Sequence, residues 1–251
     1  MAKVIGLIPV RLESTRLPEK PLKDICGLPM IVHVYKRTIM AKSLDDVYVV
    51  TDNKKIAEMI EAHGGKCIMT GTHHETGSDR INEAAEKIDC DYVVNIQGDE
   101  ALVDPKDIDT IVNAVVNDSK VEIGLLVTPF KKYNSPSDIK TVVDLNNNVM
   151  YFSRSDIPST SRTPNALMLK AYHIVPFKKE FLKKFASWEK TPLEKIEYIE
   201  YMRVLEHGHK IKTVKVDSDA VSVDTQDDLD FVRSKMPTDP IFALYKDQIG
   251  K

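Results

Sequence analysis

The first stretch whose residue types could bind a substrate runs from Val10 to Leu22 and carries Arg11, Arg16 and Lys20. It contains no glycine, which excludes the glycine-rich loops that bind dinucleotides and the glycine-rich phosphate loop of nucleotide hydrolases. Guanidinium and ammonium groups on a segment stiffened by two prolines can instead bind a triphosphate directly. The alternative is a solvated loop of mixed charge.

Two acidic stretches complement this basic one. Gln97-Gly98-Asp99-Glu100 directly follows an apolar run, and Asp224 precedes a helical pattern. Mg²⁺ takes one or two protein carboxylates and otherwise binds water and phosphate oxygens, so Asp99 and Asp224 are candidates for one metal site. The alternatives are a Gly-Asp turn at Asp99 and a helix N-cap at Asp224.

The elements that must position these groups alternate in the first half of the chain. Short β-branched runs are followed by amphipathic helical patterns, which predicts an α/β fold with a doubly wound, mostly parallel sheet and helices on both faces. In such a sheet, ligands bind beyond the carboxyl ends of the strands, where the charged loops fall. We expect strands at 3–9, 46–51, 66–69 and 92–96, and helices at 30–41, 53–63, 78–87 and from Pro105.

The pattern changes after residue 122. Strands are expected at 122–129, 141–144, 149–153 and 167–174 without intervening helices, which indicates an antiparallel insertion at about 130–190 within a single domain spanning 1–251. A capping box at Thr191–Glu194 predicts a helix through His207, ended by Gly208, with which the main domain resumes. A strand at 211–216 and a helix at 225–236 follow.

Composition excludes several classes of protein. Hydrophobic residues make up 42% of the chain, and 35 basic against 38 acidic residues leave a net charge of −3, so no basic field predicts nucleic-acid or membrane binding. The longest uncharged run is far shorter than the ~20 residues of a membrane helix. Three scattered cysteines favour a reducing cytoplasm over disulfides or zinc. The pairs His73-His74 and His207-x-His209 are expected to be turn or surface histidines.

Together the motifs resemble those of a known family, the 3-deoxy-manno-octulosonate cytidylyltransferases, or CMP-Kdo synthetases. The resemblance runs from Val4 to about Val232. The motifs that carry it are Pro9-x-Arg11, Ser14-Thr15-Arg16-Leu17-Pro18-x-Lys20-Pro21-Leu22, Gly77-Ser78-Asp79-Arg80, Gln97-Gly98-Asp99-Glu100, Tyr151-Phe152-Ser153-Arg154 and Val223-Asp224-Thr225.

This resemblance implies a fold of the nucleotide-diphospho-sugar transferase type and a homodimer held largely by the antiparallel insertion. It implies an enzyme that couples CTP to the anomeric hydroxyl of an acidic eight-carbon sugar, with Mg²⁺ as cofactor and pyrophosphate as the second product. The implied residues are Arg11, Ser14, Arg16 and Lys20 at the phosphates, Ser78 and Arg80 around cytosine and ribose, Asp99 and Asp224 at the metal, and Gln97, Arg154, Lys170 and Glu200 at the sugar. Arg11, Lys20 and Asp99 would be the catalytic residues.

Several positions depart from the family pattern. Glu19 replaces a glycine, and we expect its carboxylate to repel the triphosphate unless it points outward or pairs with Lys20 or Lys23. Tyr201 replaces a glutamine. In the segment 168–177 the family has Lys-His-x-Gly-Ile-Tyr-x-Tyr; its lysine is kept as Lys170, while its histidine, glycine and two tyrosines are Ala171, His173, Val175 and Phe177.

Loss of polar groups expected to face the sugar should change which acceptor is used more than whether CMP is transferred. The acceptor is therefore Kdo, an amino-Kdo, another 2-keto acid sugar or a different acid such as a phosphonate. Two other interpretations remain: a pyrophosphorylase for sugar 1-phosphates, and a catalytically silent nucleotide-binding relative.

Overall fold

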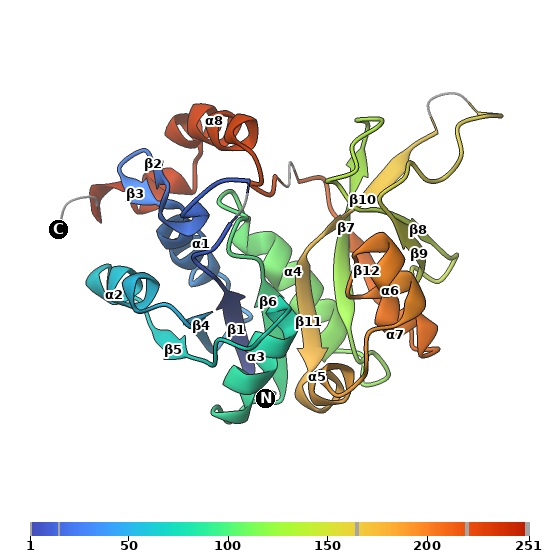
Figure 1. Cartoon of the computed structure of the whole chain (residues 1–251), viewed down its shortest axis with the longest axis horizontal. Coiled ribbons are helices and arrows are strands. Elements are labelled where there is room, and N and C mark those ends of the chain that lie inside the picture. The colour runs from blue at the N-terminus through green and yellow to red at the C-terminus, as the bar shows by residue number, and fades with distance from the viewer. Residues whose placement is uncertain (1, 15, 164–165, 219–220, 249–251) are drawn as a thin grey trace. The chain divides into compact units, whose positions relative to one another are not determined.

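The computed structural model describes the chain except for residues 1, 15, 164–165, 219–220 and 249–251. Thr15, part of the first-loop motif, lies outside the described residues. The chain forms two compact units, unit 1 from Met1–Asp109 and Ala220–Lys251 and unit 2 from Thr110–Asp219 (Figure 1). The segment predicted as an antiparallel insertion falls within unit 2.

Unit 1 is built on parallel strands: β1 (Val4–Pro9), β4 (Asp46–Thr51), β5 (Cys67–Met69) and β6 (Tyr92–Ile96). Within this unit they lie in the order β6-β1-β4-β5, with Ile5 paired to both Asp46 and Val93. The apolar runs of β1 and β6 are buried, as expected of central strands covered on both faces. The predicted α/β fold is confirmed.

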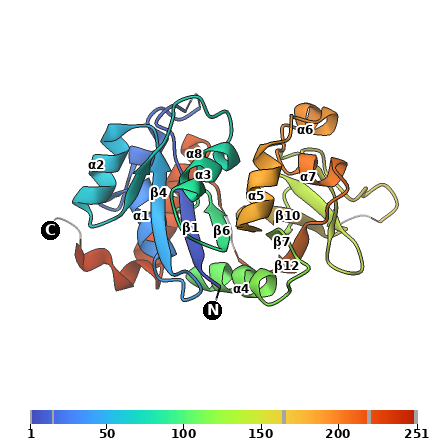
Figure 2. The same ribbon diagram turned by 90° about the horizontal axis from the view of Figure 1, so that it is seen from below.

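The helices of this unit begin within one residue of the positions expected from the sequence. They are α1 (Met30–Thr38), α2 (Lys54–Ala62), α3 (Gly77–Glu86) and α8 (Gln226–Lys235), which Figure 2 shows arranged around the strands. Asn53 caps α2, while Thr76 and Thr225 form capping boxes with the third residue of α3 and α8. The helix from Pro105, α4 (Pro105–Val116), contains the boundary between the two units.

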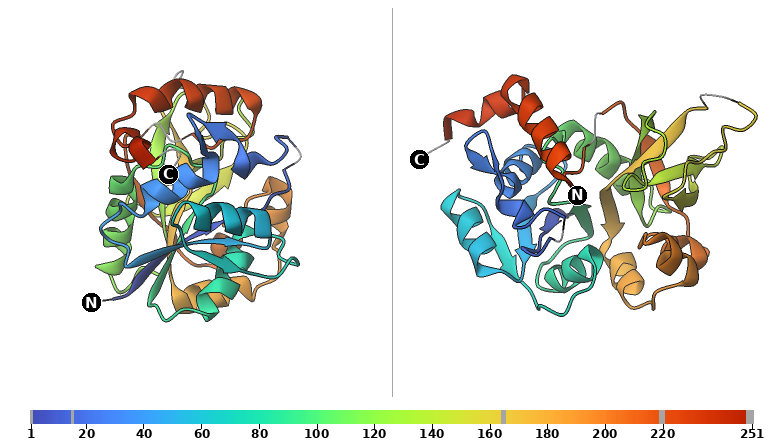
Figure 3. Two further views of the ribbon diagram at one scale, coloured as in Figure 1. Left: turned by 90° about the vertical axis from the view of Figure 1, so that its left-hand side faces the viewer. Right: turned by 45° about the horizontal axis from the view of Figure 1, so that its top comes forward.

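Two small features of unit 1 were not predicted. A 3₁₀ turn, η1 (Lys20–Leu22), leads into a hairpin of β2 (Asp24–Ile25) and β3 (Leu28–Pro29). Three further 3₁₀ turns come after α8 in the chain: η2 (Met236–Thr238), η3 (Phe242–Leu244) and η4 (Lys246–Gln248). They lie beside α1 (Figure 3, left). The buried Arg37 of α1 holds this segment through the Asp239 carboxylate at 2.8 Å.

Unit 2 contains the predicted antiparallel strands. Its sheet has the order β12-β7-β10-β8-β9, and every neighbouring pair is antiparallel except β12 with β7. The strands are β7 (Gly124–Phe130), β8 (Lys140–Val143), β9 (Val149–Ser153), β10 (Met168–Tyr172) and β12 (Lys212–Lys215). The expectation that the main domain resumes near residue 191 is wrong, because β12 completes this sheet and unit 2 extends to Asp219.

Three further expectations for unit 2 need correction. The strand predicted at 167–174 is two strands, β10 and β11 (Ile174–Lys178), and a helix that was not predicted, α5 (Lys179–Ala186), follows them. The helix predicted through His207 is two short helices, α6 (Pro192–Glu197) and α7 (Met202–Glu206). Tyr198 separates them because its φ of 55° is left-handed and ends α6. Gly208, with φ 75°, follows α7 as predicted.

No helix in the described part of the chain has both the length and the apolar character that crossing a membrane requires.

Candidate functional site

A polar pocket lies in unit 1 where β1 and β6 end. Its walls come from the loop after β1, the segment that leads into α3, the loop after β6 and Asp224 in the segment before α8. The structure thus brings together these residues predicted from the sequence: Arg11, Ser14, Arg16, Lys20, Arg80, Gln97, Asp99 and Asp224. Ser78 lies in the first turn of α3 and is fully buried.

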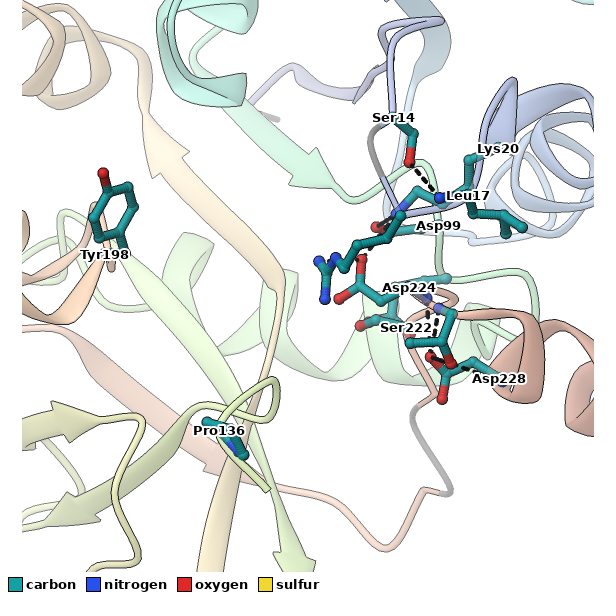
Figure 4. Close-up of polar contacts among 12 residues, drawn as sticks. Ser14, Leu17, Lys20, Asp99, Pro136, Tyr198, Ser222, Asp224 and Asp228 are labelled. Atoms are coloured by element: carbon teal, nitrogen blue, oxygen red, sulfur yellow. Dashed lines mark hydrogen bonds and ion pairs between the residues drawn. The ribbon is translucent and has the colours of Figure 1, made fainter. Parts of the chain in front are cut away.

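The centre of the pocket is a cation held between two carboxylates (Figure 4). Lys20 Nζ donates to Asp99 Oδ2 at 2.7 Å and to Asp224 Oδ1 at 3.1 Å. Arg16 Nη2 lies 3.0 Å from the same Asp224 oxygen. Burial alone would lower the pKa of Lys20, but the two carboxylates outweigh it and raise that pKa, so the ammonium stays charged.

Backbone contacts explain why the two distant aspartates converge. The Val223 N–H donates to the Asp99 carbonyl at 3.0 Å, which joins the loop after β6 to the segment before α8. Ser222 reinforces the junction by donating to the Glu100 carboxylate. Thr225 caps α8 instead of Asp224, so the Asp224 side chain is left to face Lys20. The N-cap interpretation of Asp224 is therefore wrong.

The residues present fit a magnesium ion. Asp99 and Asp224 present hard carboxylate oxygens to a shared cation position, and both side chains are about one-quarter exposed, with fractions of 24% and 25%. Mg²⁺ uses one or two carboxylates and completes its octahedron with water and substrate phosphate. In the structure the Lys20 ammonium occupies the position between these oxygens as a monovalent cation.

Glu19 turns away from this centre. Its φ of 51° and ψ of 35° are left-handed, which explains a glycine at this position of the family pattern. Its carboxylate accepts from Lys55 Nζ at 2.7 Å, and this contact lowers the pKa of Glu19. The side chain therefore points outward, and its hydrogen-bond partner is Lys55 and not the Lys20 or Lys23 expected from the sequence.

The predicted base-binding side of the pocket is held by α3. The Arg80 guanidinium is nearly buried and donates to Asp52 at 2.8 Å and to Thr70 Oγ1 at 2.7 Å. Asp52 follows β4 and was not predicted, since a lone aspartate after a strand carries no signal of its own. Arg11 and Arg16 are exposed at the pocket, where a polyanion can reach them.

The other predicted sugar residues lie in unit 2. Lys170 pairs with Asp138 at 2.6 Å. The Arg154 guanidinium donates to three backbone carbonyls, those of Pro136, Glu197 and Tyr198, at 2.8–3.0 Å. Arg154 thus ties the loop before β8 to the end of α6. Glu200 is half-buried between α6 and α7.

The departures from the family pattern are mostly packed side chains. Val175 and Phe177 are fully buried, and Phe177 packs against Tyr201 and Phe185. These two positions therefore belong to an aromatic core and do not line an open site. His173 stacks on Tyr201 with centroids 6.1 Å apart. Burial, followed by the charges of Lys170 and Arg154, lowers the pKa of His173 to about 4.

One cluster was missed by the sequence analysis. His73 and His74 lie in a loop, as expected, but Glu83 of α3 joins them, and one ligand atom from each lies within 4.8 Å of the others. The Lys87 ammonium, the Gly71 N–H and His74 lower the pKa of Glu83 to about 2. The ten residues from His74 to Glu83 match no metal-binding motif, so only the fold reveals the cluster.

The chain matches known proteins over most of its length. The cytidylyltransferase family matches residues 5–211. A 3-deoxy-manno-octulosonate cytidylyltransferase of Geobacter metallireducens is 39% identical over 93% of this chain and 98% of its own length. The enzyme of that name from Escherichia coli is 35% identical, over 94% and 97%. An 8-amino-3,8-dideoxy-manno-octulosonate cytidylyltransferase of Shewanella woodyi is 38% identical, over 93% and 98%.

Solved structures are also similar to this chain. CMP:2-keto-3-deoxy-manno-octonic acid synthetase complexed with CTP has a TM-score of 0.90 and 34% identity, covering 94% of this chain and 99% of that one. A 4-diphosphocytidyl-2C-methyl-D-erythritol synthase from Anaerococcus prevotii, at 14% identity and a TM-score of 0.61, shares the fold. The resemblance inferred from the motifs is confirmed: this nucleotidyltransferase belongs to the cytidylyltransferase family, together with the 3-deoxy-manno-octulosonate cytidylyltransferases.

Proposed function

We propose that this enzyme transfers the cytidylyl group of CTP to the anomeric hydroxyl of 3-deoxy-manno-octulosonate or its 8-amino analogue, with Mg²⁺ as cofactor. The observation that carries the proposal is the convergence of Asp99 and Asp224 on one cation beside Arg16. The hydroxyl oxygen forms a bond to the α-phosphorus of CTP. The bond between this phosphorus and the oxygen that bridges the α- and β-phosphates breaks. Pyrophosphate leaves, and the hydroxyl proton passes to solvent.

The protein's contribution is positioning and charge, because phosphoryl-type transfer spreads negative charge over phosphate oxygens and needs no covalent nucleophile. Arg11 and Arg16 line the pocket, exposed, and bind the triphosphate. Lys20 has three donors and lies at the pocket centre, so it can exchange a carboxylate for a phosphate oxygen. Asp99 and Asp224 would hold Mg²⁺, which supplies a Lewis acid for the phosphate oxygens.

The remaining predicted roles follow the same division. Arg80, fixed by Asp52 and Thr70, supports the face of the pocket that receives cytosine and ribose, with Ser78 buried behind it. Gln97 lies in the pocket wall, and we assign it to the sugar. We assign Lys170 and Glu200 of unit 2 to the sugar, and we assign Arg154 to positioning their loops because its donors are used by backbone carbonyls.

The test is pyrophosphate release from a panel of nucleotides and acceptors. Turnover with CTP and either octulosonate supports the proposal, and the ratio between the two sugars identifies the acceptor. Turnover of UTP or dTTP with a sugar 1-phosphate would establish a pyrophosphorylase instead. CTP binding without release in any mixture would establish a silent relative.

Asp99→Asn sharpens the test. The substitution keeps the shape of the side chain but removes the charge that faces the cation, and we expect turnover to fall by on the order of 10²–10³-fold. Glu13→Gln is the matched control, since this pocket carboxyl is exposed. Full activity of Asp99→Asn would refute the metal role.

We also propose that the enzyme is a cytoplasmic homodimer. Support for the dimer comes from unit 2, whose sheet ends in the edge strand β9. Exposed apolar side chains lie on and near this edge: Leu145, Met150, Ile196 and Tyr198. An apolar sheet edge of this kind favours association with a second chain. Support for the location comes from three free cysteines.

A further inference from the structure

The loop before α3 and the side of that helix present a second group of ligand-type side chains in unit 1. His73, His74 and Glu83 offer two imidazole nitrogens and a carboxylate oxygen that all lie within 4.8 Å of one another. We propose that these three residues bind a divalent transition-metal ion of the Zn²⁺ class, at a site separate from the Asp99 and Asp224 pair. The inference does not depend on which acceptor the enzyme uses.

Neighbouring groups hold the Glu83 carboxylate so that one of its oxygens faces the histidines. Glu83 Oε1 accepts from Lys87 Nζ at 2.7 Å. Glu83 Oε2 accepts from the Gly71 N–H at 2.9 Å and lies 2.5 Å from His74 Nε2. The ion would lie between His74 Nε2 and Glu83 Oε2 and replace their direct contact. Lys87 would remain on the other oxygen and fix the carboxylate from behind, as supporting contacts do in metal sites.

The second imidazole lies beside the first because of a glycine. The His73 and His74 rings have centroids 4.3 Å apart. A Cβ on Gly71 would come within 2.5 Å of the His73 ring, so only glycine admits the ring at this place. Zn–N distances of about 2.0–2.1 Å put tetrahedral ligands roughly 3.3 Å apart. His73 is exposed, so its ring can turn through the remaining distance.

The donor set selects the class of ion. Two imidazoles and one carboxylate suit Zn²⁺, Co²⁺ or Ni²⁺, whereas Mg²⁺ prefers oxygen ligands only. Three protein ligands leave a position for water or a substrate group. His74 also lines the nucleotide pocket together with Arg80, so a bound ion would fix the loop that borders CTP.

The experiment is a Zn²⁺ titration by calorimetry of the untagged full chain in millimolar Mg²⁺, with Co²⁺ absorption as a report of imidazole ligation. We expect one ion per chain. His73→Ala removes an exposed ligand without disturbing the core, and Gly71→Ala keeps all three ligands but displaces the His73 ring. Both should weaken Zn²⁺ binding by roughly tenfold or more. His63→Ala, on α2's end, and Asp99→Asn should bind Zn²⁺ as the wild type does.

Either of two results with the wild type and its site variants would overturn the inference, and so would a third with Asp99→Asn. One is no Zn²⁺ uptake by the wild type. The other is equal affinity in the wild type, His73→Ala and Gly71→Ala. Loss of Zn²⁺ binding in Asp99→Asn with retention in His73→Ala would also overturn it, because the ion would then belong to the catalytic pair. None of these results bears on cytidylyl transfer, which the pyrophosphate assay measures separately.

Discussion

Lys20 contacts both carboxylates that we propose as ligands of Mg²⁺. In the structure its ammonium neutralises Asp99 and Asp224, which would otherwise repel each other at close range. A divalent ion between the same oxygens would have to displace this ammonium. The freed ammonium would then be available to the triphosphate. Metal and nucleotide should therefore bind cooperatively, because the metal releases the Lys20 ammonium from the two carboxylates and the triphosphate gives this ammonium a new partner.

Lys20→Met tests this competition directly. Without the ammonium, the carboxylate pair should bind Mn²⁺, used as a probe for Mg²⁺, roughly tenfold more tightly in the absence of CTP, or ~1.4 kcal/mol. Turnover should fall, because the triphosphate loses a cation. Mn²⁺ binding is measured by electron paramagnetic resonance, with Lys23→Met as the control. Unchanged or weaker Mn²⁺ binding in Lys20→Met would contradict the competition.

Glu19 should lower the free energy of unfolding through its backbone conformation. Its left-handed backbone costs a residue with a Cβ roughly 1–2 kcal/mol relative to glycine. Part of this advantage of glycine is offset by the larger conformational entropy that glycine loses on folding. Glu19→Gly should stabilise the protein by roughly 0.5–1 kcal/mol in urea unfolding. Glu19→Ala keeps the strain and loses the Lys55 contact, so it should not stabilise. Equal stabilisation by both substitutions would place the effect in the carboxylate and not in the backbone.

At the scale of elements, the sequence predicts what local chemistry decides. The helices expected from residues 53 and 78 begin at Lys54 and Gly77, and the apolar run at 92–96 is the central strand β6. The residue types and their places in the chain make Asp99 and Asp224 candidates for one metal site, but an N-cap role for Asp224 stays open, because their convergence depends on a backbone hydrogen bond between segments far apart in the chain. Tertiary contacts of this kind leave no periodic signal.

The break between α6 and α7 is an example of structure that the local sequence does not predict. Ile196 and Ile199 continue the helical spacing, yet Ile196 is exposed and Ile199 is buried, because Tyr198 reverses the backbone between them. Tyrosine is not a helix stop, so nothing in the local sequence predicts this turn. The carbonyls that it frees are used by Arg154, which donates to Glu197 and Tyr198. The long-range partner decides the local conformation.

The turn between β10 and β11 should control acceptor choice. His173 stands there in place of a glycine, stacks on Tyr201 and lies in the field of Lys170 and Arg154. His173→Gly removes the ring and opens space beside these cations. We expect the KM for the acid sugar to change severalfold while the KM for CTP stays constant. His207→Ala, which removes a histidine stacked on Trp188 in the same unit, is the control. A constant acceptor KM in His173→Gly would place the sugar elsewhere.

At the scale of the whole molecule, the division into two units separates the proposed tasks. The charged pocket is built entirely from unit 1, whose parallel strands end at one edge. Unit 2 carries most of the departures from the family pattern, and three of them, Val175, Phe177 and Tyr201, are buried in its core. In unit 1 the departure is Glu19, whose carboxylate pairs with Lys55, while the residues assigned to CTP and metal match the family. This distribution favours a changed acceptor over a lost activity.

The proposed dimer gives the last prediction. Met150 on the edge strand β9 is 62% exposed and Tyr198 after α6 is 84% exposed, which leaves apolar area uncovered in a single chain. Light scattering should give about twice the chain mass of 28.4 kDa. Met150→Lys places a charge on the edge, as monomeric sheet proteins do, and should shift the mass toward that of one chain. Leu244→Lys, at an exposed apolar position of unit 1, should leave the mass unchanged. A monomeric wild type, or a dimer sensitive only to Leu244→Lys, would show that β9 is not the interface.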